Sequence, residues 1–186
     1  MIHILRKCRR HVFPLLTVLF VFLAVGCSSD SSGPSLQPKL PLVIISDVHF
    51  TPFYDKTIFH DLVNSPVEEW ADIFERSTVT DLSSWGQETN YPLLIRALDA
   101  ASQNIGDGQT VIFPGDILAH QFPETFFDLY GEEDQAALRS FVYKTVVFFA
   151  TQVRERFGNI PVMFTLGNND SYAGDYQLVP GGGISG

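Results

Sequence analysis

Cysteine is almost absent from this 186-residue sequence, because only Cys8 and Cys27 are present and both lie in the first 27 residues. No disulfide can form within the rest of the chain, so a domain there must be stabilised by a packed core. Basic residues are also scarce, with 12 Lys and Arg against 21 Asp and Glu. Four of those bases precede residue 27, so the remainder has 8 basic and 21 acidic side chains, a net charge of −13. Such an acidic body argues against nucleic acid as a partner, since nucleic-acid-binding proteins present a basic face.

Apolar residues, by contrast, make up 45% of the sequence. This fraction excludes a disordered polar tail and a collagen-like chain, which contain far fewer apolar residues. The length suits one modest globular domain.

The N-terminus has the pattern of a secretion signal. Basic residues precede an uncharged apolar run at 12–26, and this run of 15 residues is shorter than a membrane-spanning helix, which needs about 20. It ends in Ala24-Val25-Gly26-Cys27, which resembles a bacterial lipobox. The sequence therefore predicts a lipoprotein signal peptide at 1–26 and lipidation of Cys27. The product would be secreted across the inner membrane and anchored by lipid at the outer membrane or cell surface. An uncleaved anchor with an incidental cysteine is the alternative.

A polar linker follows the predicted lipidation site. Residues 27–40 are rich in Ser, Gly and Pro, which is typical of a flexible tether. The folded domain is expected to occupy residues 41–186.

Three continuous apolar runs, at 42–45, 110–113 and 161–166, predict β-strands, and such runs are typical of strands buried on both faces. Helical periodicity between them predicts helices at about 90–103 and 132–157. The alternation of strand and helix predicts an α/β fold with a mostly parallel sheet and covering helices.

The ends of the predicted helices carry capping residues. Asn90 is expected to cap the first helix, and Gly158 is expected to end the second. Residues 50–89 fit neither period. They include several aromatic residues, and they are expected either to wall a substrate pocket or to form a surface excursion with a small satellite core.

Polar side chains follow each predicted strand. Asp47 and His49 follow the first, Asp116 follows the second and Asn168 follows the third. In layered α/β folds ligands bind at this edge of the sheet. Residues two apart in an extended backbone project to the same side, so Asp47 and His49 could hold one divalent metal. Asp116 could add a bridging carboxylate and Asn168 a neutral oxygen. Taken singly, each residue could equally be a strand-end or turn residue.

Taken in order, these motifs resemble those of the calcineurin-like metallophosphoesterases. The matching segments are Asp47-Val48-His49, Gly115-Asp116 and Gly167-Asn168-Asn169-Asp170. Three further features resemble the acid sphingomyelinase-like branch: Tyr54, the run Gly86-Gln87-Glu88-Thr89-Asn90-Tyr91-Pro92-Leu93-Leu94, and the run from Gly115 to His120. The resemblance covers residues 41–172. It implies the N-terminal part of a layered metallophosphoesterase α/β fold.

The resemblance also implies a chemistry and a role for each residue. Asp47 and His49 would bind one of two divalent ions (Zn, Fe or Mn), Asp116 would bridge both, and Asn168 would bind the second. Two dications about 3.5–4 Å apart can clamp a phosphate and lower the pKa of a shared water towards 7. The implied substrate is a phosphoester: a phospholipid head-group diester by branch, with polyphosphate as the second possibility. His120 is implicated in catalysis, with an ordinary helix-start histidine as the alternative.

Two departures from the family pattern matter. The family usually has His where this chain has Asn169, although endopolyphosphatases of the same branch show a similar motif. The family also supplies three later histidine ligands, the last two in a Gly-His-X-His motif, and this sequence has no histidine after His120. The sequence therefore predicts an N-terminal fragment that is poorly active alone. A non-catalytic lipid-anchored binding protein with a remnant metal site, and a non-functional gene fragment, are the alternatives.

Overall fold

Three short parallel strands form the centre of the fold in the computed structural model, which describes residues 42–106 and 109–177. The strands are β1 (Leu42–Ile44), β2 (Thr110–Phe113) and β3 (Val162–Phe164), in the order β1-β2-β3. Both pairs are parallel, as the alternation of strand and helix predicted. The predicted signal peptide, the tether and Cys27 lie outside the described residues.

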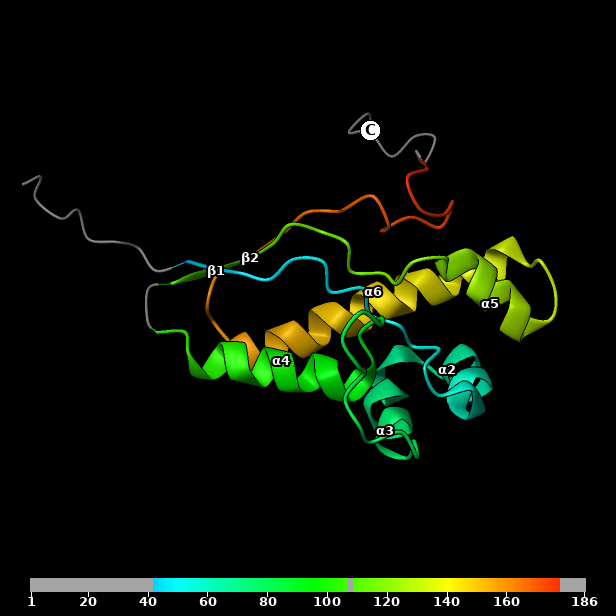
Figure 1. Cartoon of the computed structure of the whole chain (residues 1–186), viewed down its shortest axis with the longest axis horizontal. Coiled ribbons are helices and arrows are strands. Elements are labelled where there is room, and N and C mark those ends of the chain that lie inside the picture. The colour runs from blue at the N-terminus through cyan, green and yellow to red at the C-terminus, as the bar shows by residue number, and fades with distance from the viewer. Residues whose placement is uncertain (1–41, 107–108, 178–186) are drawn as a thin grey trace, which may run out of the picture. The chain divides into compact units, whose positions relative to one another are not determined.

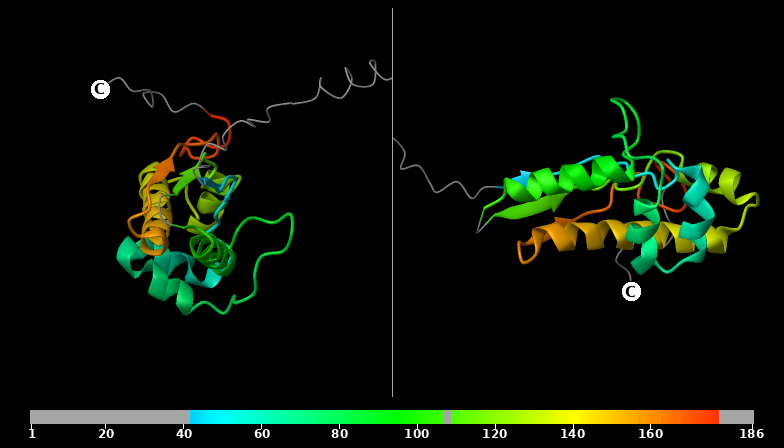
Figure 2. Two further views of the ribbon diagram at one scale, coloured as in Figure 1. Left: turned by 90° about the vertical axis from the view of Figure 1, so that its left-hand side faces the viewer. Right: turned by 90° about the horizontal axis from the view of Figure 1, so that it is seen from below.

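Two long helices cover one face of this sheet (Figures 1 and 2). They are α4 (Tyr91–Gln103) and α6 (Gln135–Phe157), and they connect the strands in the predicted order. The expected α/β fold with a parallel sheet and covering helices is therefore confirmed. No helix in the described part of the chain is long and apolar enough to cross a bilayer.

Local capping chemistry sets the ends of both long helices. The Asn90 side chain accepts a hydrogen bond from Leu93 N (3.1 Å), which confirms it as the cap of α4. The Asp134 carboxylate accepts from Ala136 N (2.8 Å), so α6 begins at Gln135, three residues later than predicted. Gly158 ends α6 at a φ of +57°, as expected from its sequence position.

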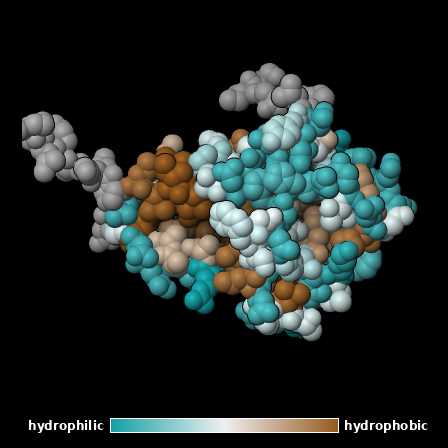
Figure 3. All heavy atoms as spheres, viewed as in Figure 1, coloured by the Kyte–Doolittle hydropathy of each residue, from teal (hydrophilic) through white to brown (hydrophobic). Residues whose placement is uncertain are grey.

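The opposite face of the sheet is open in the described part of the chain. Val111 and Phe113 are buried, at 0% and 1% exposure, but Leu42, Ile44 and Met163 are 49%, 60% and 58% exposed. Figure 3 shows the resulting apolar patch at the end of the molecule where the strands lie. The prediction of strands buried on both faces is therefore wrong for these residues, because the described helices pack on one face alone.

The segment between β1 and α4 folds into short helices that complete the main core. These are η1 (Lys56–Ile58), α2 (Phe59–Asn64), η2 (Val67–Glu69) and α3 (Trp70–Glu75). Trp70 is fully buried, and its ring centroid lies 5.2 Å from that of Phe141 in α6. The idea of a satellite core is therefore wrong, since the aromatic residues of this segment belong to the same core as α6. Trp85 of the same segment is fully exposed and takes no part in this core.

One more helix follows the second strand. Helix α5 (Phe122–Tyr130) contributes Phe122 and Phe126 to the core and leads into α6. The two loops that precede α4 and α5, together with the chain after β1 and β3, hold all the candidate site residues described below.

Candidate metal centre

Beyond the carboxyl edge of the sheet, three segments of the chain run side by side. His49 N donates to Asp116 O (2.9 Å), and Phe50 N donates to Ile117 O (2.6 Å). On the other side of the same segment, Thr89 N donates to His49 O (3.0 Å). Isolated parallel bridges join Phe50 to both neighbouring segments. The polar residues after β1, the loop before α4 and the loop after β2 are therefore held together by backbone hydrogen bonds.

This pairing gathers three of the four predicted metal ligands. Asp47, His49 and Asp116 each offer one ligand atom, and these atoms lie within 4.8 Å of one another. Asp47 is exposed, whereas His49 and Asp116 are half-buried. Two carboxylates and an imidazole are a donor set that suits borderline divalent ions such as Zn, Fe and Mn. The residues that the structure brings together thus fit the metal that the sequence pattern implies.

The backbone that aims these side chains is left-handed. Asp47 has a φ of 54°, His49 of 45° and Asp116 of 55°. The expectation that Asp47 and His49 converge because both lie in extended backbone is therefore wrong. Non-glycine residues occupy this region at a cost, and residues held in such conformations cluster at functional sites. Three of the five such residues in the described chain are predicted metal ligands.

Two glycines let the loops after β2 and β3 approach each other closely. A Cβ atom at Gly167 would overlap the carboxylate and the backbone nitrogen of Asp116. A Cβ atom at Gly115, whose φ is +118°, would overlap the backbone of Gly167. Side chains larger than hydrogen are thus excluded at both positions, and the glycines permit the convergence that the sequence predicted.

Asp170 joins these two loops through hydrogen bonds. Its Oδ1 accepts hydrogen bonds from Ile117 N (2.7 Å) and Leu118 N (2.9 Å), and its Oδ2 accepts one from Gly167 N (2.8 Å). No role for Asp170 was predicted from the sequence. Its place at the end of the Gly-Asn-Asn-Asp motif is the one local signal that could have drawn attention to it.

The two asparagines of that motif occupy different environments. Asn168 is exposed, and its Nδ2 donates to Asn169 Oδ1 (2.5 Å). Asn169 is buried at 1% exposure, and its backbone N donates to Asp116 Oδ1 (3.0 Å). The Asn169 Nδ2 atom also lies 3.3 Å from His49 Nδ1. Asn168 therefore stays a predicted ligand, while Asn169, which the sequence singled out as a departure, contacts two of the three gathered residues.

A backbone carbonyl orients His49. Its Nδ1 lies 3.3 Å from Leu118 O, so a proton on Nδ1 can be donated there. That tautomer leaves Nε2 unprotonated, which is the form in which imidazole binds a metal.

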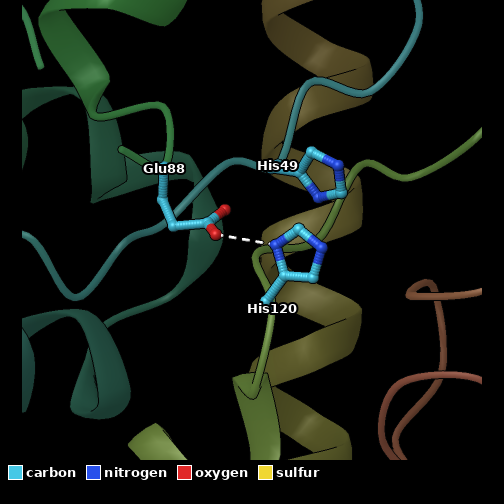
Figure 4. A group of neighbouring side chains, drawn as sticks. All are labelled: His49, Glu88 and His120. Carbon is cyan, nitrogen blue, oxygen red and sulfur yellow. Dashed lines mark hydrogen bonds and ion pairs between the residues drawn. The ribbon is translucent and has the colours of Figure 1, made fainter. Parts of the chain in front are cut away.

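His120 lies against His49. The two imidazole rings stack with centroids 4.2 Å apart and an interplanar angle of 20° (Figure 4). His120 precedes helix α5, which begins at Phe122, so the helix does not place the His120 ring. The backbone pairing between the two segments, which ends with Ala119 N donating to Phe50 O (3.2 Å), brings the two rings together.

Glu88 contacts the Nδ1 edge of the His120 ring, whereas His49 stacks on its face. His120 Nδ1 lies 2.8 Å from Glu88 Oε1, and this contact is both a hydrogen bond and an ion pair when the ring is protonated. The hydrogen bond to Glu88 is the main cause that raises the pKa of His120 above its ordinary value of 6.5, and partial burial opposes the rise. Glu88 belongs to one of the family-like motifs in the sequence, but no function was predicted for it.

His49, Glu88 and His120 form a second group whose ligand atoms lie within 4.8 Å of one another. An imidazole binds a metal through a lone pair in the ring plane, and the nearly parallel planes of His49 and His120 do not direct their lone pairs to one point. This arrangement favours an imidazole oriented by a carboxylate over a set of ligands for a single ion.

A comparison with known protein families agrees with the geometry. A family model described as calcineurin-like phosphoesterase matches residues 40–183, which include all the candidate site residues from Asp47 to Asp170. Neither among curated proteins nor among solved structures was a significant match found.

Proposed function

The chain belongs to the calcineurin-like phosphoesterase family, and from this premise we propose that it hydrolyses phosphodiesters with the help of two divalent metal ions. Metal-dependent phosphoester hydrolysis is the chemistry that the family suggests. The observation that carries the proposal is the convergence of Asp47, His49 and Asp116 within 4.8 Å at the ends of β1 and β2.

In this proposal Asp47 and His49 would hold one cation, Asp116 would serve as a ligand to both, and Asn168 would contribute an amide oxygen to the second. Two bound divalent cations supply positive charge that polarises the phosphoryl group and acidifies a water molecule. The net negative charge of the protein does not oppose an anionic substrate, because bound cations dominate the local field. The chain itself contributes the fixed positions of the donor atoms. The left-handed backbone and the three hydrogen bonds accepted by Asp170 maintain these positions.

His120 is proposed to protonate the leaving oxygen of the ester. Asn169 cannot do so near neutral pH, because an amide has no proton that titrates in this range. The raised pKa of His120, caused mainly by its hydrogen bond to Glu88, favours the protonated ring. Because Nδ1 is bound to Glu88, the proton for the leaving oxygen would come from Nε2.

The proposed substrate is a phospholipid head-group diester, as in the acid sphingomyelinase-like branch, and polyphosphate is the second candidate. The proposed location is a bacterial membrane, through a lipid on Cys27. Lipid labelling of the wild type and its loss in Cys27→Ser would support this location, and unchanged labelling in the variant would contradict it.

We expect residues 1–186 to bind metal weakly. They offer Asp47, His49, Asp116 and Asn168, whereas the family resemblance implies three further imidazole ligands from later segments. Weak binding and slow turnover are therefore expected, and tight binding of two ions by residues 1–186 alone would require ligands not identified in this chain.

The test combines metal analysis with hydrolysis. The full chain would be loaded with Zn or Mn, analysed for bound metal, and assayed with bis(4-nitrophenyl) phosphate beside the Asp116→Asn variant. Metal-stimulated hydrolysis that Asp116→Asn abolishes would support the proposal. Metal binding without any hydrolysis would overturn it in favour of a non-catalytic binding protein. Sphingomyelin vesicles and polyphosphate, compared in the same assay, would separate the two substrate candidates.

A further inference from the structure

We infer that Glu88 is a positioning residue that fixes the orientation of the His120 ring, an inference about turnover that rests on the proposed function. The Glu88 carboxylate approaches the ring edge that carries Nδ1, at 2.8 Å. Figure 4 shows the second ring nitrogen of His120 on the edge away from Glu88. The hydrogen bond therefore decides which of the two nitrogens is available to a substrate.

The backbone around Glu88 is held firmly on its C-terminal side. Thr89 N donates to His49 O (3.0 Å), so Glu88 directly precedes a residue paired with the metal-site segment. Asn90 is buried at 1% exposure, caps α4, and donates through Nδ2 to Asp81 O (2.8 Å).

The N-terminal side is held as well. Gln87 N donates to Ser84 O (3.1 Å), and Gln87 Oε1 accepts from the Tyr54 hydroxyl (3.0 Å). The carboxylate is thus presented to His120 from a fixed stretch of backbone on both sides, as a positioning role requires.

Stacking on His49 cannot provide the same control. A ring rotated by 180° about its Cβ–Cγ bond would stack equally well, but it would exchange the places of its two edges. The His120 side chain is 48% exposed, so packing does not prevent this rotation. The hydrogen bond to Glu88 distinguishes the two orientations, because only a nitrogen on that edge can donate to the carboxylate.

The contact with His120 is the one interaction of the Glu88 carboxylate within the described residues that suggests a function. Its Oε2 atom is buried and has no hydrogen-bond partner among the described residues, which costs stability. Its Oε1 bonds to His120. The stacked rings of His49 and His120 do not direct their lone pairs to one point, so these two residues and Glu88 are not suited to bind a single metal ion together. The contact with His120 is therefore the function that best explains a carboxylate at this position.

The test compares Glu88→Leu, which removes the acceptor, with Glu88→Gln, which keeps a neutral acceptor. Glu132→Leu, at an exposed residue outside the site, is the matched control. Each full-length, metal-loaded variant would be assayed at its own pH optimum on two diesters, one with an alkyl and one with a nitrophenyl leaving group. Metal content would be measured in parallel, and the ¹⁵N shifts of the His120 ring would be recorded at a pH where the ring is neutral.

Glu88→Leu is expected to lower kcat on the alkyl diester by about 10- to 100-fold, the range for losing a partner that orients an imidazole. The loss on the nitrophenyl diester should be much smaller, and KM, metal content and the control should not change. Glu88→Gln should retain most of the activity. In the ¹⁵N spectra, wild type and Glu88→Gln should show the proton on Nδ1, while Glu88→Leu should show both tautomers.

Three results would overturn the inference. Equal losses in Glu88→Gln and Glu88→Leu would show that the charge matters and not the orientation. Loss of metal in either variant would make Glu88 a ligand. An unchanged tautomer in Glu88→Leu would show that another contact orients the ring. Should the wild type show no metal-stimulated hydrolysis, the proposed function fails, and the ¹⁵N comparison still decides the orienting role.

Discussion

Replacing Asp170 by alanine is the most direct test of how the site is assembled. The substitution removes a carboxylate that accepts three backbone hydrogen bonds, from Ile117, Leu118 and Gly167. Hydrogen bonds to a charged group contribute about 1.5–3 kcal/mol each when buried, and less when partly exposed. For three half-buried bonds, Asp170→Ala should lower the free energy of unfolding by about 3–5 kcal/mol. That is a large part of the stability of a domain of this size, which is about 5–15 kcal/mol.

Urea unfolding of the full chain measures this loss, with the m-value as a check that the unfolded state has not changed. Asp170→Asn should lose about half as much, because one oxygen can still accept from Ile117 and Leu118 while the new NH₂ group faces Gly167 N–H. Asp128→Asn, at an exposed residue of α5, is the control and should stay within about 0.5 kcal/mol of wild type. A loss below about 1 kcal/mol in Asp170→Ala would refute the idea that this carboxylate joins the two loops.

Three further substitutions test other parts of the structure. Gly167→Ala should abolish metal binding, because the new Cβ would overlap the predicted bridging carboxylate of Asp116. Gly106→Ala is the control: its Cβ would contact only the flexible side chain of Gln109, so this variant should bind metal like wild type. His120→Ala should lower turnover on an alkyl diester by about 10²–10⁴-fold and much less on a nitrophenyl diester; equal losses would rule out proton donation. Hydrogen bonds, first among them that from the Ser77 hydroxyl, hold the pKa of Asp55 below its ordinary value of 3.8. Asp55→Asn should therefore destabilise the protein by about 1–2 kcal/mol at pH 7, and the difference from wild type should shrink as the pH falls below about 4; a difference that grows on acidification would contradict this.

The sequence predicts the elements of this fold well because their signals are local. Apolar runs mark the strands, and Asn90 and Gly158 mark helix ends through contacts with residues only a few positions away. The order of strand ends also brings Asp47, His49 and Asp116 together without any detailed knowledge of side chains, because parallel strands end at one edge.

The remaining features depend on contacts that no local pattern encodes. Glu88 meets His120 across 32 positions of sequence, and Asp170 meets Ile117 across 53. The left-handed backbone at Asp47 and His49 was also unpredictable, since neither residue is a glycine and the preceding run favours extended structure. Likewise, a continuous apolar run indicates that a strand can be covered on both faces, but the helices that pack against it decide whether it is.

Backbone and side-chain hydrogen bonds support the strained backbone of the site. Each left-handed non-glycine residue costs about 1–3 kcal/mol, and the neighbouring hydrogen bonds offset this cost. These are the bonds from His49 N and Asn169 N to Asp116, together with those that Asp170 accepts. Asp170 contributes only to this scaffold, whereas the Asp116 carboxylate both accepts from Asn169 N and is a predicted metal ligand. Asp47 is exposed and has no part in this scaffold, so Asp47→Asn should weaken metal binding at least tenfold while changing the free energy of unfolding of the metal-free protein by less than about 0.5 kcal/mol. Calorimetric metal titration and urea unfolding of the same preparation measure both quantities, and a large loss of stability in Asp47→Asn would show that Asp47 is itself part of the scaffold.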